Sequence, residues 1–323
     1  MEVAENLHMI RSEYHGIYTA VYLVTGKHLT LIDAGELESW NNVIKPYIQK
    51  INRDPKELKL VVITHNHDDH VSGARQIREE TGAIIAAGEK TAAFLANPAS
   101  IMEWEEKSFE GYLTEEEKKQ ILEGTDYHGT PRHKRQPLIV DYYLKEGEII
   151  DADPLKLGVI YAPGHTIDSI ALYDKEKKIL FTGDAVNGEG TTLDDLIVIQ
   201  SLDDFTFTLK RLEKLDVNLL LTSHPYLPLK EVALRGEKAK QMIRLTIKMS
   251  DKIAAKILET LKTANRPMTT AEISSAVASA LGPNKPAPRG HGTVRLHLLK
   301  HLKEGRVTVA MKNGEVWWSL SKY

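Results

Sequence analysis

The sequence predicts a mixed α/β fold, in which helices pack over β-sheets, extended by a helical insertion and by a C-terminal winged-helix domain. Over the first 88 residues, short apolar runs alternate with stretches of helical periodicity. A charged, helix-rich stretch at 89–148 interrupts this alternation, and two helices followed by a hairpin end the chain. We therefore expect a main domain at 1–235 with a helical cap insertion at 89–148, and a helical linker with a winged-helix-like domain at 236–323.

Apolar runs bounded by glycine indicate the strands of the main domain, and apolar residues at helical spacing, such as Trp40, Ile44 and Ile48, indicate its helices. Strands are expected at 17–26, 28–35, 58–63, 83–88, 156–164, 169–174, 178–185 and 217–224. Helices are expected at 38–52, 72–82 and 203–215.

The insertion carries eight Lys and Arg against thirteen Asp and Glu, a net charge of −5, with aromatic residues spread through it. These aromatics, among them Phe94, Trp104 and Tyr127, form either the core of the insertion or part of a pocket for an apolar group. The basic run Arg132-His133-Lys134-Arg135 is either a solvated loop or a site for a carboxylate or a phosphate.

The C-terminal part is expected to begin with a long helix at about 236–262. A helix capped by threonine and closed by Gly282 follows, then a second helix ended by Gly305 and a hairpin that turns at Asn313-Gly314. Two helices and a hairpin in this order are typical of the winged helix.

Charge is distributed unevenly along the chain. From Asn265 onward nine Lys and Arg stand against three Asp and Glu, a net charge of +6, whereas the first 264 residues carry −9. A basic winged helix contacts nucleic acid in one interpretation, and supports dimerisation or forms a pocket wall in the other, which the modest charge favours. The residues that would meet nucleic acid are Arg295, His297, Lys300 and His301.

Composition restricts the chemistry that the chain can support. The 323 residues include no cysteine, so disulfides and thiolate metal sites are excluded, and any metal must be bound by His, Asp or Glu. No apolar run approaches the roughly 20 residues that span a bilayer, and the N-terminal stretch has no secretory pattern. We therefore expect a cytoplasmic protein that does not insert into membranes.

Potential metal ligands follow several of the predicted strands. "THNHDDH" at 64–70 directly follows the strand "LKLVVI" and contains His65, His67, Asp69 and His70. Three further strands end in one such residue each. Because strand ends of layered α/β folds gather at one edge, a metal site is the expected result. The three further residues are His165, Asp184 and His224.

These motifs resemble those of the metallo-β-lactamase superfamily over roughly residues 15–230. "THNHDDH", "APGHT", "FTGDA", the histidine of "LLLTSH" and the early "LIDAG" occur in the family's order. The resemblance implies a four-layer αββα sandwich that holds two divalent metal ions, zinc being expected and iron or manganese being accepted by the same ligands. It implies one ion on His65, His67 and His165, a second on Asp69, His70 and His224, and Asp184 between them.

The resemblance also implies hydrolysis by a metal-bridging hydroxide. Asp69 is expected either to orient this hydroxide, as a catalytic residue, or to act as a ligand alone. Asp33 is expected to lie outside the ligand set. Asp68 is expected to be either a solvent-facing carboxylate or one outside the ligand set that helps to orient a histidine.

The stretches "GDAVNGEGTT" and "HLLKHLKEGRV" resemble the lactamase-β-like group, which carries a winged-helix-like tail and includes an endoribonuclease for single-stranded RNA and fungal thioesterases. "SHPYLP" departs from that group's usual Gly-His-Gly at the last histidine. The acidic, aromatic insertion favours a small-molecule or acyl-carrier substrate with an ester, thioester or lactone bond over RNA. The alternatives are the endoribonuclease and a non-enzymatic, nucleic-acid-binding regulator with a metal-sensing domain. We also expect a homo-oligomer.

Overall fold

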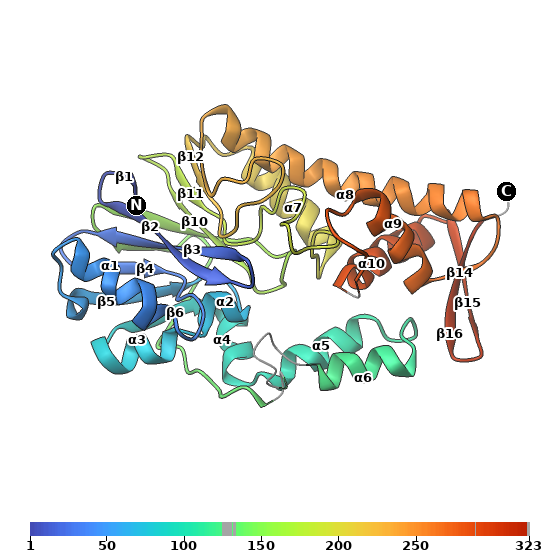
Figure 1. The fold of residues 1–323 in the computed structure, drawn as a ribbon, viewed down its shortest axis with the longest axis horizontal. Coiled ribbons are helices and arrows are strands. Elements are labelled where there is room, and N and C mark those ends of the chain that lie inside the picture. Colours follow the sequence, from blue (N-terminus) through green and yellow to red (C-terminus); the bar gives the residue numbers. More distant parts are fainter. Residues whose placement is uncertain (125–130, 132–133, 288, 322–323) are drawn as a thin grey trace.

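The computed structural model describes residues 1–124, 131, 134–287 and 289–321. Two β-sheets face each other in the left half of Figure 1, and helices cover their outer faces. The first sheet has seven strands in sequence order, and β4, β5, β6 and β7 run parallel to one another. Its strands are β1 (Glu2–Ala4), β2 (Leu7–Tyr14), β3 (Ile17–Thr25), β4 (Leu29–Ile32), β5 (Leu58–Ile63), β6 (Ile84–Gly88) and β7 (Tyr142–Leu144).

The second sheet has six strands in the order β13-β12-β11-β10-β9-β8. Only the β11–β12 pair among them is parallel, and helix α7 (Leu202–Glu213) lies between these two strands in the chain. The strands are β8 (Ile149–Ala152), β9 (Leu155–Tyr161), β10 (Ile170–Asp174), β11 (Ile179–Phe181), β12 (Leu219–Leu221) and β13 (Ala233–Arg235).

Successive side chains of a strand point to opposite faces of its sheet, and both faces are covered, so the domain has four layers. In β5, Val62 belongs to the apolar cluster between the two sheets, whereas Val61 and Ile63 belong to the cluster beneath the helices of the first sheet. In β11, Phe181 faces the inner cluster and Leu180 faces the cluster under α7 and α8. Because both faces of these strands are buried, their sequences are continuous apolar runs. The layers are therefore helix, sheet, sheet and helix, as expected.

Helices of the first outer layer connect the strands of the first sheet. Trp40, Ile48 and Ile77 are fully buried against the sheet and anchor this layer. The π-helix η1 continues directly into α1. The elements are η1 (Trp40–Ile44), α1 (Lys45–Lys50), the 3₁₀ turn η2 (Pro55–Glu57), α2 (Asp68–Val71), α3 (Ala74–Thr81) and α4 (Glu89–Ala96).

The expected insertion at 89–148 contains helices and also one strand of the first sheet. Helices α5 (Ala99–Ser108) and α6 (Glu115–Glu123) lie beyond the sheets, close to the C-terminal elements (Figure 1). Strand β7, which the sequence pattern did not predict, pairs with β6. Tyr127, Arg132 and His133 lie outside the described residues.

The C-terminal elements continue the core of the second sheet. Helix α8 (Glu237–Ala264) runs from that sheet to α9 (Thr270–Leu281) and α10 (Arg289–Lys303) (Figure 1). A three-stranded sheet completes the chain, in the order β14-β16-β15. Its strands are β14 (Met268–Thr269), β15 (Val307–Lys312) and β16 (Glu315–Leu320). One continuous apolar cluster joins Leu180 and Leu220 of the second sheet to Val294 and Trp318, so the core does not break near residue 235.

Helix α10 buries one arginine and two histidines. Arg295, His297 and His301 are each 2–3% exposed, and only Lys300 of the residues expected at a nucleic-acid surface is exposed. Val294 and Leu298 are fully buried, as their helical spacing predicts. Among the described residues, no helix combines the length and the apolar character needed to cross a membrane.

Candidate metal centre

The seven side chains expected as metal ligands meet at one edge of the two sheets. His65 and His67 lie in the turn after β5, and Asp69 and His70 lie in α2, the short helix that follows. His165, Asp184 and His224 each stand three or four residues beyond β9, β11 and β12. All except the half-buried His67 are buried.

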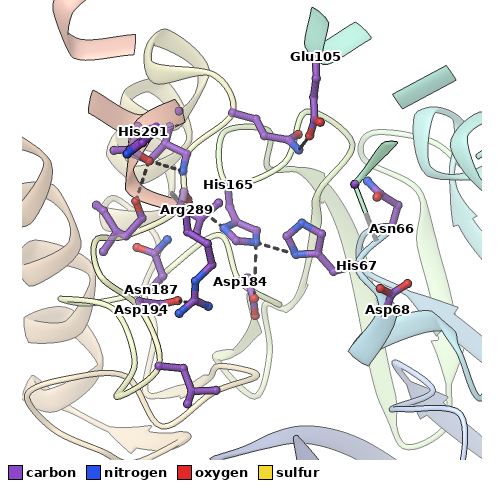
Figure 2. A pocket seen from close by; sticks show the side chains of 18 of the residues that line it. Asn66, His67, Asp68, Glu105, His165, Asp184, Asn187, Asp194, Arg289 and His291 are labelled. Atoms are coloured by element: carbon purple, nitrogen blue, oxygen red, sulfur yellow. Dashed lines mark hydrogen bonds and ion pairs between the residues drawn. The ribbon is translucent and has the colours of Figure 1, made fainter. Parts of the chain in front are cut away.

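The cluster divides into two groups, each of which brings its ligand atoms within 4.8 Å of one another. Figure 2 shows His67 and His165 facing each other above Asp184, with 3.2 Å between His165 Nε2 and His67 Nδ1. The two groups are His65, His67, His165 and Asp184, and Asp69, His70 and His224.

Asp184 belongs to the first group and also faces the second. Its Oδ2 is 3.5 Å from His165 Nε2 in the first group and 3.4 Å from His224 Nε2 in the second. Its Oδ1 is 3.6 Å from His70 Nε2. A carboxylate with an oxygen toward each group is placed to bridge two cations.

Unpaired buried atoms indicate that the cluster suits metal ions. His65 Nε2, His70 Nε2 and Asp184 Oδ1 are buried and have no hydrogen-bond partner among the described residues. Burying such atoms without a partner is costly, and divalent cations would satisfy them. Imidazole nitrogens and carboxylate oxygens are the donors that zinc, iron and manganese accept.

Hydrogen bonds at the second ring nitrogen orient the histidines. His165 Nδ1 and His224 Nδ1 donate to the carbonyl oxygens of Val198 and Tyr18, each at 3.0 Å. These bonds place the proton on Nδ1, so that Nε2 presents its lone pair to the centre.

Asp33 holds the metal-ligand loop at 64–70 through its carboxylate. It has a positive φ of 62°, and its carboxylate accepts hydrogen bonds from the Thr64 backbone N–H at 2.8 Å and from the Thr64 hydroxyl at 2.9 Å. The same carboxylate lies 2.8 Å from His70 Nδ1. Since the Thr64 hydroxyl donates to Asp33, it accepts from His65 Nδ1 at 3.0 Å. Asp33 thus lies outside both ligand groups, in a position to orient His70.

Asp69 and its neighbour Asp68 have different surroundings. Thr19 Oγ1 donates to Asp69 Oδ2 at 2.6 Å, and this oxygen is 3.2 Å from His224 Nε2. Asp68 instead pairs with Arg135, which belongs to the basic run in the insertion. Arg135 is therefore not a solvated residue, and it fastens the inserted segment to the metal-ligand loop.

Burial keeps two of the ligand histidines neutral. It lowers the pKa of His65 well below the ordinary value, and the neighbouring His70 ring adds to this effect. It also lowers the pKa of His67 to about 3. Both rings therefore offer a free lone pair at neutral pH.

Neighbouring carboxylates raise the pKa values of the two histidines in the second group. Burial opposes the charged form of His70, but Asp69 and Asp33 raise its pKa well above the ordinary value. Burial likewise opposes a charge on His224, whose pKa Asp184 and Asp69 raise well above the ordinary value. Protons and metal ions therefore compete for these two rings.

The cluster forms the floor of a cavity of about 610 Å³, a size that suits a small-molecule substrate. Trp104 of α5, Phe109 directly after α5 and Ile121 of α6 line one wall. The first turns of α10 provide another wall with Arg289 and His291. Asn187, from the turn after Asp184, also lines it. The sequence pattern did not identify Asn187, Arg289 or His291, and the only local signal is the turn sequence "NGEG".

The insertion and the C-terminal elements touch above this cavity. Arg295 of α10 forms an ion pair with Glu117 of α6, and its guanidinium lies 5.3 Å from the centre of the Phe109 ring. Tyr112, between α5 and α6, stacks on Trp318 of β16 with a ring separation of 6.0 Å. Trp318 is thus a core residue, and α10 is a wall of the pocket.

Four layers with a His/Asp cluster at one edge of two facing sheets define the metallo-β-lactamase sandwich. The family model described as the metallo-beta-lactamase superfamily matches residues 16–224. The chain therefore belongs to the metallo-β-lactamase superfamily.

Curated relatives with enzyme names match parts of this chain. A beta-lactamase-like protein 2 homolog of Caenorhabditis elegans is 26% identical over 209 residues, 64% of this chain and 55% of the relative. The hydroxyacylglutathione hydrolase GloC of Haemophilus influenzae is 30% identical over 139 residues, 43% of this chain and 55% of the relative. An acyl-coenzyme A thioesterase of Gallus gallus is 29% identical over 157 residues, 48% of this chain and 51% of the relative. The chain spans about half the length of these relatives.

A solved structure shares the fold over nearly the whole chain. The crystal structure of a metallo-beta-lactamase family protein from Thermus thermophilus has a TM-score of 0.73 at 19% identity. The match covers 98% of this chain and 99% of that chain, so it includes the C-terminal elements.

Proposed function

We propose that this protein is a dinuclear metal-dependent hydrolase of a carboxylic ester, a thioester or a lactone. One observation carries the proposal. The His/Asp cluster lies at the floor of a pocket that is partly lined by apolar side chains such as Trp104 and Ile121, and in which the arginines are paired with carboxylates. Relatives named as a hydroxyacylglutathione hydrolase and an acyl-coenzyme A thioesterase support an acyl substrate.

Two divalent ions held by the two ligand groups would supply an activated water and a Lewis acid for the substrate carbonyl. The chain's own residues prepare this chemistry. Asp33 and the backbone carbonyls of Val198 and Tyr18 hold the rings in place. Thr19 donates to Asp69 Oδ2, the oxygen that lies 3.2 Å from His224 Nε2, and so holds this carboxylate toward the second ligand group. We propose zinc as the resident metal, because its usual donors are present.

Charge pairing in the pocket favours an acyl substrate over RNA. Among the described residues, the arginines that line the pocket are Arg135, Arg289 and Arg295, and no lysine lines it. Each of these arginines pairs with a carboxylate, from Asp68, Asp194 and Glu117 respectively. A nuclease site requires cations that remain available for phosphates.

The C-terminal elements have a structural role in this proposal. We interpret α9, α10 and the three-stranded sheet as a winged-helix-like domain that forms one wall of the pocket. The small-molecule or acyl-carrier substrate, nucleic-acid binding, a homo-oligomeric state and a cytoplasmic location all stay predictions.

Parallel assays would test the proposal. Zinc-loaded protein would be assayed on acyl-coenzyme A thioesters, aryl esters, lactones and labelled single-stranded RNA. We expect acyl hydrolysis that is lost in His67→Ala and retained in His28→Ala, since His28 is an exposed histidine far from the cluster in sequence. Cleavage of RNA without acyl hydrolysis would support the endoribonuclease instead. No turnover together with tight nucleic-acid binding would support the regulator.

A further inference from the structure

Asn187 presents an unpaired amide to the pocket. Its side chain is 3% exposed and lines the cavity, three residues beyond the ligand Asp184. Neither Nδ2 nor Oδ1 has a hydrogen-bond partner among the described residues. A buried amide without partners is costly, and such groups are expected where a ligand completes them.

The turn that carries Asn187 is rigidly held. The Asn187 carbonyl accepts a hydrogen bond from the Gly190 N–H at 2.9 Å, and the Gly188 N–H donates to the Thr246 hydroxyl of α8 at 2.8 Å. A Cβ on Gly188 would lie 2.4 Å from the Leu227 carbonyl oxygen, so this position requires glycine. These contacts hold the backbone of Asn187 in place beside the pocket.

The surroundings of Asn187 are polar and charge-balanced. In Figure 2, Asn187 and Arg289 lie on the side of His165 opposite to His67. Arg289 Nη1 is 3.5 Å from Asp194 Oδ1, which offsets its charge. Burial lowers the pKa of His291, so this ring is neutral at neutral pH.

We propose that Asn187 binds a neutral group of the substrate's acyl part that both donates and accepts hydrogen bonds, a hydroxyl or an amide, with α10 as the wall of this subsite. A primary amide offers a donor and an acceptor. A carboxylate would leave Oδ1 unpaired, and an ammonium would leave Nδ2 unpaired. The C-terminal elements thereby take part in substrate selection. This inference rests on the proposed acyl hydrolase.

A matched series of thioesters tests the subsite. Butyryl-coenzyme A provides the apolar reference, 3-hydroxybutyryl-coenzyme A the hydroxyl, N-acetyl-β-alanyl-coenzyme A the amide and succinyl-coenzyme A the carboxylate. We expect kcat/KM to be highest for the hydroxyl or the amide substrate. Whichever of these two has the higher kcat/KM identifies the group that the subsite binds. In Asn187→Leu the ratio of that kcat/KM to the butyryl value should fall about tenfold to a hundredfold. Asn42→Leu, at an exposed asparagine, should leave the ratio unchanged.

Two further measurements separate recognition from folding. Asn187→Leu removes an unpaired buried amide, so its melting temperature should equal or exceed that of the wild type. The product hydroxy acid or acylamino acid should bind wild-type protein more tightly than Asn187→Leu by calorimetry. An unchanged substrate ratio, or a preference for succinyl-coenzyme A, would overturn the subsite. If wild-type protein hydrolyses none of the thioesters, the proposed function fails, and product binding alone then decides the subsite.

Discussion

The ion pair between Arg295 and Glu117 connects α10 to the insertion, and its removal has a calculable cost. The Arg295 side chain is 4% exposed and the Glu117 side chain is 20% exposed. Breaking a buried pair costs about 3–5 kcal/mol, because the remaining charge is left buried without its partner. In Glu117→Gln the amide still accepts a hydrogen bond, and the Phe109 ring still faces the guanidinium at 5.3 Å. We therefore expect a loss of about 2 kcal/mol in unfolding free energy.

Urea denaturation of Glu117→Gln, Arg295→Met and the double variant would measure this cost. The double variant should be more stable than the sum of the single effects predicts, with a coupling of about 1–2 kcal/mol. Glu103→Gln, at an exposed position of α5, is the matched control and should stay within about 0.5 kcal/mol of wild type. Additive single effects, or a loss in Glu117→Gln as small as that of the control, would refute the buried connection.

Three other predictions concern the metal centre. Asp33→Asn should weaken zinc binding about tenfold to a hundredfold by competition with a chelating dye, because His70 loses the carboxylate that orients it; unchanged affinity would contradict that role. Because the pKa values of His70 and His224 are raised well above the ordinary value, both rings still carry protons at pH 6.5 and lose them only at higher pH. Zinc affinity should therefore increase about tenfold per unit rise in pH for each proton displaced. Calorimetry in buffers of different ionisation enthalpy should detect the released protons, and a pH-independent affinity would contradict this. Finally, free zinc at about 1,000 times its dissociation constant should stabilise the fold by about 4 kcal/mol relative to protein in excess chelator, measured by urea denaturation.

The strands that precede the metal ligands were predictable because a run of consecutive apolar residues marks each of them in the sequence. Strand β5 has the bounds that its apolar run predicts, and its ligand histidines follow it directly. In β11 and β12 likewise, every residue is buried, so that burial on both faces produces an uninterrupted apolar run.

Other features depend on contacts between distant segments. Strand β7 has three residues, of which Tyr142 and Tyr143 are about half exposed, so no apolar run marks it. Arg295 is expected at the surface by residue type, but it is buried because its partner Glu117 stands 178 positions earlier in the chain. Asn187 looks like an ordinary turn residue, and only the folded pocket shows that its amide is buried without a partner.

The most direct test of the central claim is a metal titration followed by thioester hydrolysis. Chelator-treated protein would receive zinc in steps, and the initial rate on the best thioester would be plotted against zinc per chain. Hydrolysis that is absent without zinc and saturates at two equivalents is the expected result, because the ligand atoms form two groups joined by Asp184. Full hydrolysis without zinc, or no hydrolysis at any zinc level, would contradict the account.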